Sequence, residues 1–221
     1  MDGRMMLFEQ LRALEMPFTS IVQVGANRGQ EVAAYANYGL DWAVMVEPQE
    51  DAFDKLRKRV AGHPRFIAVQ ALCSEVDGEE YDFFIASNKG QSSSLLKPTR
   101  HRIKHPTVEF PTQIRLVSTT LDTLLDGVAS EHPALALATF DTLLIDAQGA
   151  ELKVLMGATR LLRQVNYVYS EISFDLYDGG ATLDDLQGYL RGFGFHLHYL
   201  QLNRHGWGDG LFIKTGPAAA P

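Results

Sequence analysis

The sequence predicts an α/β fold in which helices cover both faces of a doubly wound, mostly parallel sheet of seven strands, with an antiparallel final strand. Short apolar runs, each long enough for one buried strand, alternate with longer segments whose apolar residues recur at helical spacing. The first run ends in a glycine turn that leads directly into a helix. Strands joined through helices at this spacing form parallel βαβ units with right-handed crossovers.

The expected elements follow one another along the whole chain. Strands are expected at residues 21–24, 42–46, 65–72, 140–146, 166–171, 195–202 and 211–214. Helices are expected at residues 5–14, 50–60, 123–128, 151–162 and 183–193, and around Val32, Ala33 and Ala36. In the helix at 151–162, the side chains expected to point inward are Leu152, Leu155, Met156 and Leu161. Residues 79–86 and 113–118 are expected to be additional extended segments.

The chain is expected to form one main domain. Residues 1–17 form an N-terminal helix packed on it, residues 18–215 form the domain, and residues 216–221 form a flexible tail. Residues 87–112 interrupt the alternation as a loop insertion without helical or strand periodicity, with Gly90 and three consecutive serines. Because the insertion follows strands that end at the ligand crevice of such a sheet, it is expected to be a mobile lid.

Composition limits the classes of partner. The 221 residues are 46% apolar and carry a formal charge of -7, which argues against a nucleic acid partner. Cys73 is the single cysteine, so an intrachain disulfide framework is excluded. No long apolar segment predicts stable membrane insertion, and a soluble, cytoplasmic protein is the simplest expectation. The basic run at residues 100–105 is either a solvated surface or a contact for an acidic group.

The first strand and its turn indicate a nucleotide site. Gly25 allows a sharp turn where a side chain would block a ligand, and Gly29 allows the helix to begin close to the sheet. Glu47, 22 residues after Gly25, ends the second strand at the spacing of an acid that binds ribose hydroxyls. The glycines do not follow the dinucleotide pattern, so a ribose without a pyrophosphate fits better. Alternatively, Glu47 caps the helix that follows it.

Two further acids end strands at the same edge of the sheet. Asp146 and Glu171 are the candidates for a base beside a reacting hydroxyl. Each acid has a simpler alternative role: Asp146 only binds the cofactor, or Glu171 only caps a turn, and neither takes part in the reaction. A carboxylate-bound Mg²⁺ on this pair is a further alternative, although no metal site is predicted. His196 and His198 share a face of one expected strand and are expected to be ordinary core or surface imidazoles.

The motifs VQVGANRGQ, VEP, STTLD and LLIDAQGAELKVLMGA, in this order and with a Ser-Ser-Leu stretch between them, resemble the FkbM family of S-adenosylmethionine-dependent methyltransferases. The resemblance covers most of residues 21–214. It implies the Rossmann-like class I methyltransferase fold and S-adenosylmethionine as cofactor. It also implies methylation of a hydroxyl oxygen on a sugar, glycan, glycolipid or natural product, so that the partner is a small-molecule or glycan acceptor.

The resemblance also implies roles for individual positions. It places a turn under the methionine part of the cofactor, a ribose acid at the end of strand two, an adenine pocket after strand three, and an acid beside the reactive sulfonium. These positions are, in the same order, Gly25, Ala26, Asn27 and Gly29; Glu47 with Pro48; Leu72, Cys73 and Ser74; and Asp146.

Two positions depart from the family pattern. Gln23 stands where the family usually has an acid under the methionine amine, and Leu144 stands where a lysine is common. An amide forms hydrogen bonds but does not pair with a charged amine, so the departure at Gln23 affects cofactor affinity. Two other functions remain open: an NAD-dependent oxidoreductase, favoured by Glu47, and a non-catalytic Rossmann-like binding module, suggested by Gln23.

Overall fold

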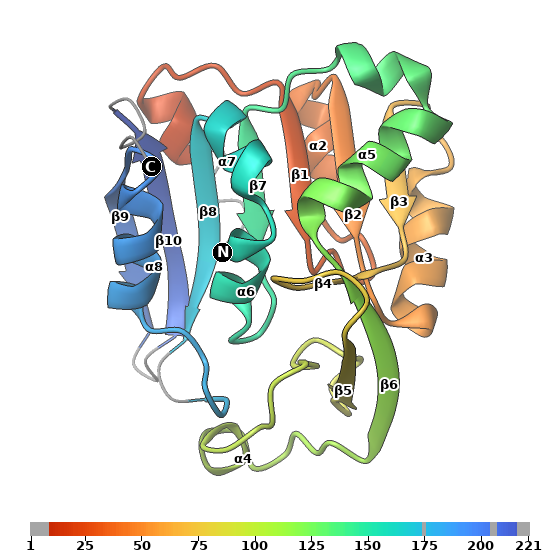
Figure 1. Cartoon of the computed structure of the whole chain (residues 1–221), viewed down its shortest axis with the longest axis vertical. Helices are drawn as coiled ribbons and strands as arrows, with labels where there is room; N and C mark the ends of the chain where they lie inside the picture. The colour runs from red at the N-terminus through yellow and green to blue at the C-terminus, as the bar shows by residue number, and fades with distance from the viewer. Residues whose placement is uncertain (1–8, 174–175, 204–206, 216–221) are drawn as a thin grey trace.

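The structure is a computed structural model that describes residues 9–173, 176–203 and 207–215. Within these ranges, the central sheet has seven strands in the order β3-β2-β1-β7-β8-β10-β9 (Figure 1). The strands are β1 (Ser20–Val24), β2 (Trp42–Val46), β3 (Phe66–Val69), β7 (Thr142–Ile145), β8 (Tyr167–Ser173), β9 (Phe195–Leu202) and β10 (Trp207–Lys214). The strands from β3 to β8 in this order are parallel, and β10 is antiparallel to β8 and β9. The predicted fold class is confirmed.

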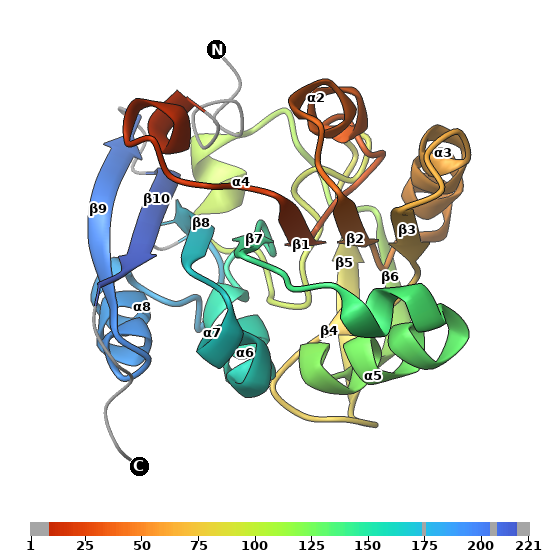
Figure 2. The ribbon, with the colours of Figure 1, turned by 90° about the horizontal axis from the view of Figure 1, so that it is seen from above.

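Helices cover both faces of this sheet, as Figure 2 shows from above. On one face lie α2 (Val32–Tyr38) and α3 (Glu50–Val60), which bury Tyr35 and Leu56. On the other face lie α5 (Leu121–Glu131), α6 (Glu151–Met156), α7 (Thr159–Gln164) and α8 (Leu183–Arg191). The short 3-10 helix η1 (Pro133–Leu137) follows α5. The two faces form separate apolar cores because side chains alternate between the faces of each strand.

The apolar run expected as one third strand is divided between two sheets. Residues 66–69 form β3 of the central sheet, whereas β4 (Leu72–Cys73) pairs with β6 (Thr112–Thr119). Strand β6 also pairs antiparallel with β5 (Glu80–Ile85), so that β4, β6 and β5 form a second sheet of three strands. The chain leaves the central sheet at Gln70, whose side chain is exposed. A continuous apolar run gives no sign of such a change of sheet.

The expected helix over residues 151–162 is divided at Gly157. A Cβ atom at Gly157 would lie 2.2 Å from the carbonyl oxygen of Ser74, so the chain passes that segment too closely for a side chain. Leu155 and Leu161 are buried as expected, but Met156 is 45% exposed. The inward position predicted for Met156 is therefore wrong, because the helix ends beside it and α7 starts in a new direction.

The insertion at residues 87–112 lies beyond the carboxyl ends of the central strands (Figure 1). It is packed rather than patternless, and it contains the short helix α4 (His101–Lys104). Ser94 and Phe84 exchange two backbone hydrogen bonds, of 2.8 and 3.1 Å, and the Thr99 amide donates to the Leu176 carbonyl. Ser92, Ser93 and Ser94 are all buried. Apart from α4, most of the insertion lies outside helices and strands, and serine hydroxyls accept hydrogen bonds from backbone amides around it.

The two ends of the chain are described only in part. Residues 9–13 are helical, and Leu11 is buried in the same apolar cluster as Ile21 and Leu211. The rest of the expected N-terminal helix and the expected tail at 216–221 lie outside the described residues. Within the part of the chain that the structure describes, no helix combines the length and the apolar character that crossing a bilayer requires.

Candidate active site

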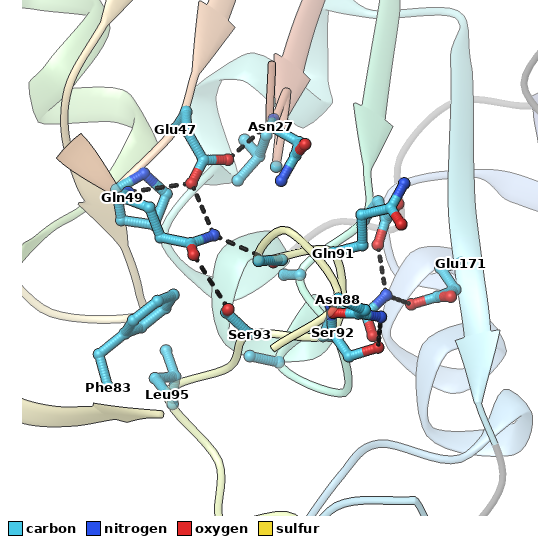
Figure 3. Close-up of a pocket in the computed structure, with 18 of the residues that line it drawn as sticks. Asn27, Glu47, Gln49, Phe83, Asn88, Gln91, Ser92, Ser93, Leu95 and Glu171 are labelled. Carbon is cyan, nitrogen blue, oxygen red and sulfur yellow. Dashed lines mark hydrogen bonds between the residues drawn. The ribbon is translucent and has the colours of Figure 1, made fainter. Parts of the chain in front are cut away.

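A pocket of about 540 Å³ opens at the carboxyl ends of the parallel strands. Four adjacent strands each bring a residue to the wall of this pocket. Gly25, Glu47 and Asp146 directly follow β1, β2 and β7, and Glu171 lies within the carboxyl-terminal half of β8. Figure 3 shows Glu47 and Glu171 on opposite sides of this pocket, with Asn27 near Glu47. Ligands of open α/β sheets bind in this position.

The glycine turn is tight because two strand ends meet there. Gly25 has a φ of +80°, and a Cβ atom on it would lie 1.9 Å from the carbonyl oxygen of Asp146. The amides of Gly25 and Ala26 both donate to the carbonyl of Val46, at 3.0 and 2.9 Å. The backbone at the end of β7 therefore occupies the position that a side chain at residue 25 would need, while Gly25 itself lines the pocket. A Cβ atom on Gly29 would lie 2.7 Å from the side chain of Leu56 in α3. The missing side chain of Gly29 therefore makes room for α3 and not, as expected, for the sheet.

The carboxylate of Glu47 is buried, with 2% of the residue exposed. It accepts hydrogen bonds from the amide of Asn27 at 2.8 Å, and from the amide and side chain of Gln49 at 2.9 and 3.1 Å. Burial raises the pKa of Glu47 from 4.5 to about 7, although the bonds from Gln49 and Asn27 oppose this shift. The side chain is thus held in place by β1 and by the start of α3.

Gln49 joins Glu47 to the insertion. Its Nε2 also donates to the carbonyl of Gly90 at 3.1 Å, and its Oε1 accepts from the hydroxyl of Ser93 at 3.0 Å (Figure 3). Sequence reasoning missed Gln49 and gave no role to the individual serines. The run of serines was the available signal, since small hydroxyl side chains suit a turn whose polar groups are bonded internally.

The opposite side of the pocket is built around Gln148. Its Nε2 donates to Asp146 at 2.8 Å and to Glu171 at 2.6 Å, so that one amide bridges both candidate bases. Its Oε1 lies 2.9 Å from the hydroxyl of Tyr177, which is also 2.9 Å from the carbonyl of Ser92. The two acids thus lie close together as predicted, but the sequence analysis gave no role to Gln148, whose amide connects them.

This side of the pocket concentrates buried acids. Burial is the main cause that raises the pKa of Glu171 well above its usual value, and the charges of Asp146, Glu151 and Asp209 raise it further. Burial also raises the pKa of Glu151 to about 7. Glu151 accepts bonds from the amides of Ala147 and Gly149, so its role is to close the turn after β7. Burial and these neighbouring charges therefore favour the protonated form of Glu171.

An apolar wall lies on the Glu47 side. Leu72, Cys73, Phe83 and Leu95 line it, and Figure 3 shows Phe83 and Leu95 below Gln49. Cys73 is buried, and desolvation raises the pKa of its thiol to about 12, which leaves it an apolar lining group rather than a nucleophile. Phe83 and Leu95 come from the second sheet and the insertion, and sequence reasoning did not select them.

The structure divides the predicted site residues into two groups. Those that line the pocket are Gly25, Asn27, Glu47, Pro48, Leu72, Cys73, Asp146 and Glu171. Those that are buried behind its walls, or lie in the turn without lining it, are Gln23, Ala26, Gly29 and Ser74. Both candidate bases and the ribose acid are thus brought to one cavity.

Gln23 faces away from the pocket into the layer of α2. Its Oε1 accepts from the hydroxyl of Tyr35 at 2.7 Å, and its Nε2 donates to Glu31 at 3.3 Å. Leu144 lies directly beside it, because Gln23 and Leu144 are partners in the register of β1 and β7. Gln23 does not line the pocket, whereas Val24 does, since alternation along β1 puts these two residues on opposite faces of the sheet.

The described part of the chain holds no group of three or more His, Cys, Asp or Glu side chains arranged to bind a metal ion. His196 and His198 are both exposed on β9, as alternate residues of one strand are expected to be. Two histidines of the insertion do line the pocket: His105, and His101 of α4, which is 3% exposed.

The known proteins to which the chain is similar are methyltransferases. Residues 23–197 match the model of the methyltransferase FkbM domain. The chain is 24% identical over 178 residues to the 2-O-methyltransferase NoeI of Sinorhizobium fredii, which covers 77% of this chain and 70% of that protein.

Solved methyltransferases share the fold. TrmK of M. capricolum, in complex with S-adenosylhomocysteine, has a TM-score of 0.51 and 8% identity over 96% of this chain and 69% of its own. The magnesium protoporphyrin IX methyltransferase ChlM of Synechocystis PCC 6803, with bound S-adenosylmethionine, has a TM-score of 0.51 and 8% identity over 95% and 77%. Together with the family match over most of its length, this fold places the chain in the FkbM methyltransferase domain family.

Proposed function

We propose that the chain transfers a methyl group from S-adenosylmethionine to a hydroxyl oxygen of a sugar, glycan, glycolipid or natural product. The family supports methyl transfer, and the relative NoeI, named a 2-O-methyltransferase, supports oxygen as the acceptor atom. The observation that carries the proposal is the buried carboxylate of Glu47 at one end of a pocket whose other end holds Asp146 and Glu171.

The residues of the Glu47 side fit a nucleoside. A buried carboxylate fixed by two backbone amides is a rigid acceptor for a pair of ribose hydroxyls. Leu72, Cys73 and Phe83 offer the apolar surface that an adenine ring requires. The turn at Gly25 and Asn27 lies between this nucleoside position and Asp146, where the methionine part would lie.

The residues of the opposite side suit the acceptor. S-adenosylmethionine supplies a methyl carbon activated by a positively charged sulfur. The protein then has to orient the hydroxyl, exclude water and take up a proton as the oxygen–carbon bond forms. We assign the proton to Asp146, oriented by Gln148, and assign to Glu171 the role of a hydrogen-bonding carboxyl group. The second possibility, that Asp146 only positions the cofactor, predicts a binding defect without a specific loss of turnover in Asp146→Asn.

The acceptor is proposed to be a small molecule or a glycan rather than a nucleic acid. The chain carries a formal charge of -7, and the acceptor side of the pocket is lined by Asp146, Glu171 and Asp209. A phosphate backbone would be repelled by this combination.

Titration calorimetry tests the cofactor. S-adenosylhomocysteine is expected to bind with one site per chain, whereas NADH is not, because the turn lacks the glycine pattern that holds a pyrophosphate. Binding of NADH alone would instead support the oxidoreductase alternative, and binding of neither ligand would support a non-catalytic module. The oxygen assignment is tested by incubating hydroxylated metabolites with labelled S-adenosylmethionine and locating the new methyl group by NMR.

A further inference from the structure

The pocket has a second, chemically distinct end beside α4, β8 and β10. Glu171 of β8 and both Trp207 and Asp209 of β10 line it, and α4 contributes His101. The register of β8 and β10 sets Asp209 directly opposite Glu171. Because Glu171 lies on the far side of the pocket from Glu47 (Figure 3), the nucleoside position leaves this end available for another ligand.

His101 is the residue at this end whose hydrogen bonding is incomplete. Its side chain is almost fully buried, at 3% exposure, and its Nδ1 has no hydrogen-bond partner. The ring is held by aromatic neighbours, with centroids 4.8 Å from His105, 5.4 Å from Phe110 and 5.6 Å from Tyr177. A buried nitrogen without a partner is unfavourable in a folded protein unless a ligand completes it.

The groups at this end are suited to hydrogen bonding without charge. Burial lowers the pKa of His101 to about 4, and the neighbouring His105 lowers it further, so its imidazole is neutral and keeps one acceptor nitrogen. Burial and the neighbouring acids favour the protonated form of Glu171, which can donate as well as accept. Trp207, which is 36% exposed, adds a large flat surface at the same end of the pocket.

On the basis of the proposed function, we propose that this end is the acceptor subsite and that it takes an uncharged polyhydroxylated ring. One hydroxyl of the ring donates to His101, the ring lies against the face of Trp207, and further hydroxyls bond to Glu171 and Asp209. An aromatic side chain offers contact area to the C–H face of such a ring while polar neighbours bind its hydroxyls.

The basic run at residues 100–105, which includes His101, does not give the subsite a preference for anionic acceptors. Arg100 and Arg102 are exposed, and neither lines the pocket, whereas His101 does. Apart from His101 and His105, the ionisable side chains that line this end are carboxyl groups, which disfavour an anionic acceptor close to Asp146 and Asp209.

A matched pair of probes tests the inference. Methyl β-D-glucopyranoside and methyl β-D-glucuronide differ only at C6, which is a hydroxymethyl group in the first and a carboxylate in the second. Their binding is measured by saturation-transfer NMR with and without S-adenosylhomocysteine. The glucopyranoside is expected to bind and the glucuronide to bind at least about tenfold more weakly. Equal or tighter binding of the glucuronide, or no binding of the glucopyranoside, would overturn the proposal.

Variants locate the site. His101→Phe keeps the ring packing and removes the acceptor nitrogen, so it is expected to weaken the glucopyranoside by about tenfold while the dissociation constant of S-adenosylhomocysteine stays unchanged. His101→Asn restores an acceptor and is expected to recover part of the loss, and Trp207→Leu is expected to weaken binding similarly. His63→Phe, at a histidine stacked on Phe66 outside the pocket, is the matched control. Unchanged binding in both pocket variants would overturn the subsite.

The experiments distinguish failure of the proposed function from failure of the acceptor subsite. Loss of S-adenosylhomocysteine binding in the wild-type chain would remove the proposed function, and the glucopyranoside measurement without cofactor would still report on the subsite. Bound cofactor together with a glucopyranoside signal that is insensitive to His101 would remove only the subsite.

Discussion

The hydroxyl of Ser93 donates to Oε1 of Gln49 at 3.0 Å and so ties the insertion to the end of β2. Since Gln49 also donates to Glu47 and to the Gly90 carbonyl, the proposed ribose-binding acid Glu47 and the insertion share one hydrogen-bonded unit. A Cβ atom at Gly90 would lie 2.3 Å from Gln49, which shows how closely the two segments approach. The insertion is thus fastened to the pocket wall at Gln49 by hydrogen bonds within the protein itself.

Hydrogen exchange is expected to show a protected insertion in the ligand-free protein. The amides of Ser93, Ser94 and Thr99 donate to backbone carbonyls at 3.0 to 3.1 Å, and they should exchange slowly without cofactor. A mobile lid would instead give fast exchange at these amides in the free protein and protection only after S-adenosylhomocysteine is added. That second pattern would contradict the packing described above.

Glu47→Gln is expected to weaken S-adenosylhomocysteine. The variant keeps the shape of the side chain but removes charge-assisted bonds to the ribose, which corresponds to a loss of roughly 1.5 to 3 kcal/mol, or about 10- to 150-fold in the dissociation constant. Calorimetry is the measurement. Glu50→Gln, at an exposed acid in the first turn of α3, is the matched control and should bind normally. Wild-type affinity in the Glu47 variant would remove this residue from the cofactor site.

The stability of the free protein is expected to fall between pH 4.5 and about pH 7. The pKa of Glu47 is raised to about 7 in the folded state, so the folded state binds more protons than the unfolded chain in this interval. The free energy of unfolding therefore decreases as the pH rises, by about 3 kcal/mol for Glu47 alone. Urea unfolding of wild type and Glu47→Gln measures the difference. Parallel pH dependence of the two proteins would show that Glu47 is ionised normally.

Gln23→Asp is expected to destabilise the fold without tightening the cofactor, which reverses the expectation from the family pattern. An aspartate would place a buried charge near Glu31 and shorten the reach to Tyr35, at a cost of roughly 2 to 4 kcal/mol. Adding Leu144→Lys should recover part of this loss, because residue 144 is the strand partner of residue 23.

The control for this pair is Gln113→Asp, the same change at an exposed position of β6. Denaturation gives the coupling energy of the double variant, and calorimetry gives the affinity of each protein for S-adenosylhomocysteine. A Gln23→Asp variant that is stable and binds more tightly would place residue 23 back at the cofactor.

Gly25→Ala is expected to cost far more stability than Gly39→Ala. Both glycines have a positive φ, of +80° and +74°, so both changes introduce similar backbone strain, of about 1 to 2 kcal/mol. A Cβ at Gly39 meets nothing within 4 Å, whereas one at Gly25 overlaps the Asp146 carbonyl. Thermal unfolding therefore isolates the overlap, and equal losses at the two positions would show that β7 can move aside.

The regular elements of the fold followed from local pattern. The helix at Glu50–Val60 begins and ends where its apolar spacing indicates, and the strand at Trp42–Val46 does the same. The errors arose where long-range contact decides the outcome. The chain leaves the central sheet at Gln70, and α6 ends at Gly157 because Ser74 lies against it. No local spacing contains either contact.

The candidate site was accessible from the sequence only in its strand ends. Acids at the ends of parallel strands must meet at one edge, which explains why Glu47, Asp146 and Glu171 line one pocket. Gln148 was missed because its role depends on two partners 2 and 23 residues away. His101 was missed because its burial depends on how the insertion folds back on the strand ends.

The position of β10 between β8 and β9 has a consequence for how the protein is made. In the described sheet β9 pairs with β10 alone. The edge of β8 that does not face β7 also pairs with β10. During synthesis, residues 195–202 therefore remain without a sheet partner until residues 207–214 have left the ribosome. A nascent chain halted before that point exposes two strand edges at once, which makes it a substrate for chaperones and a source of aggregation.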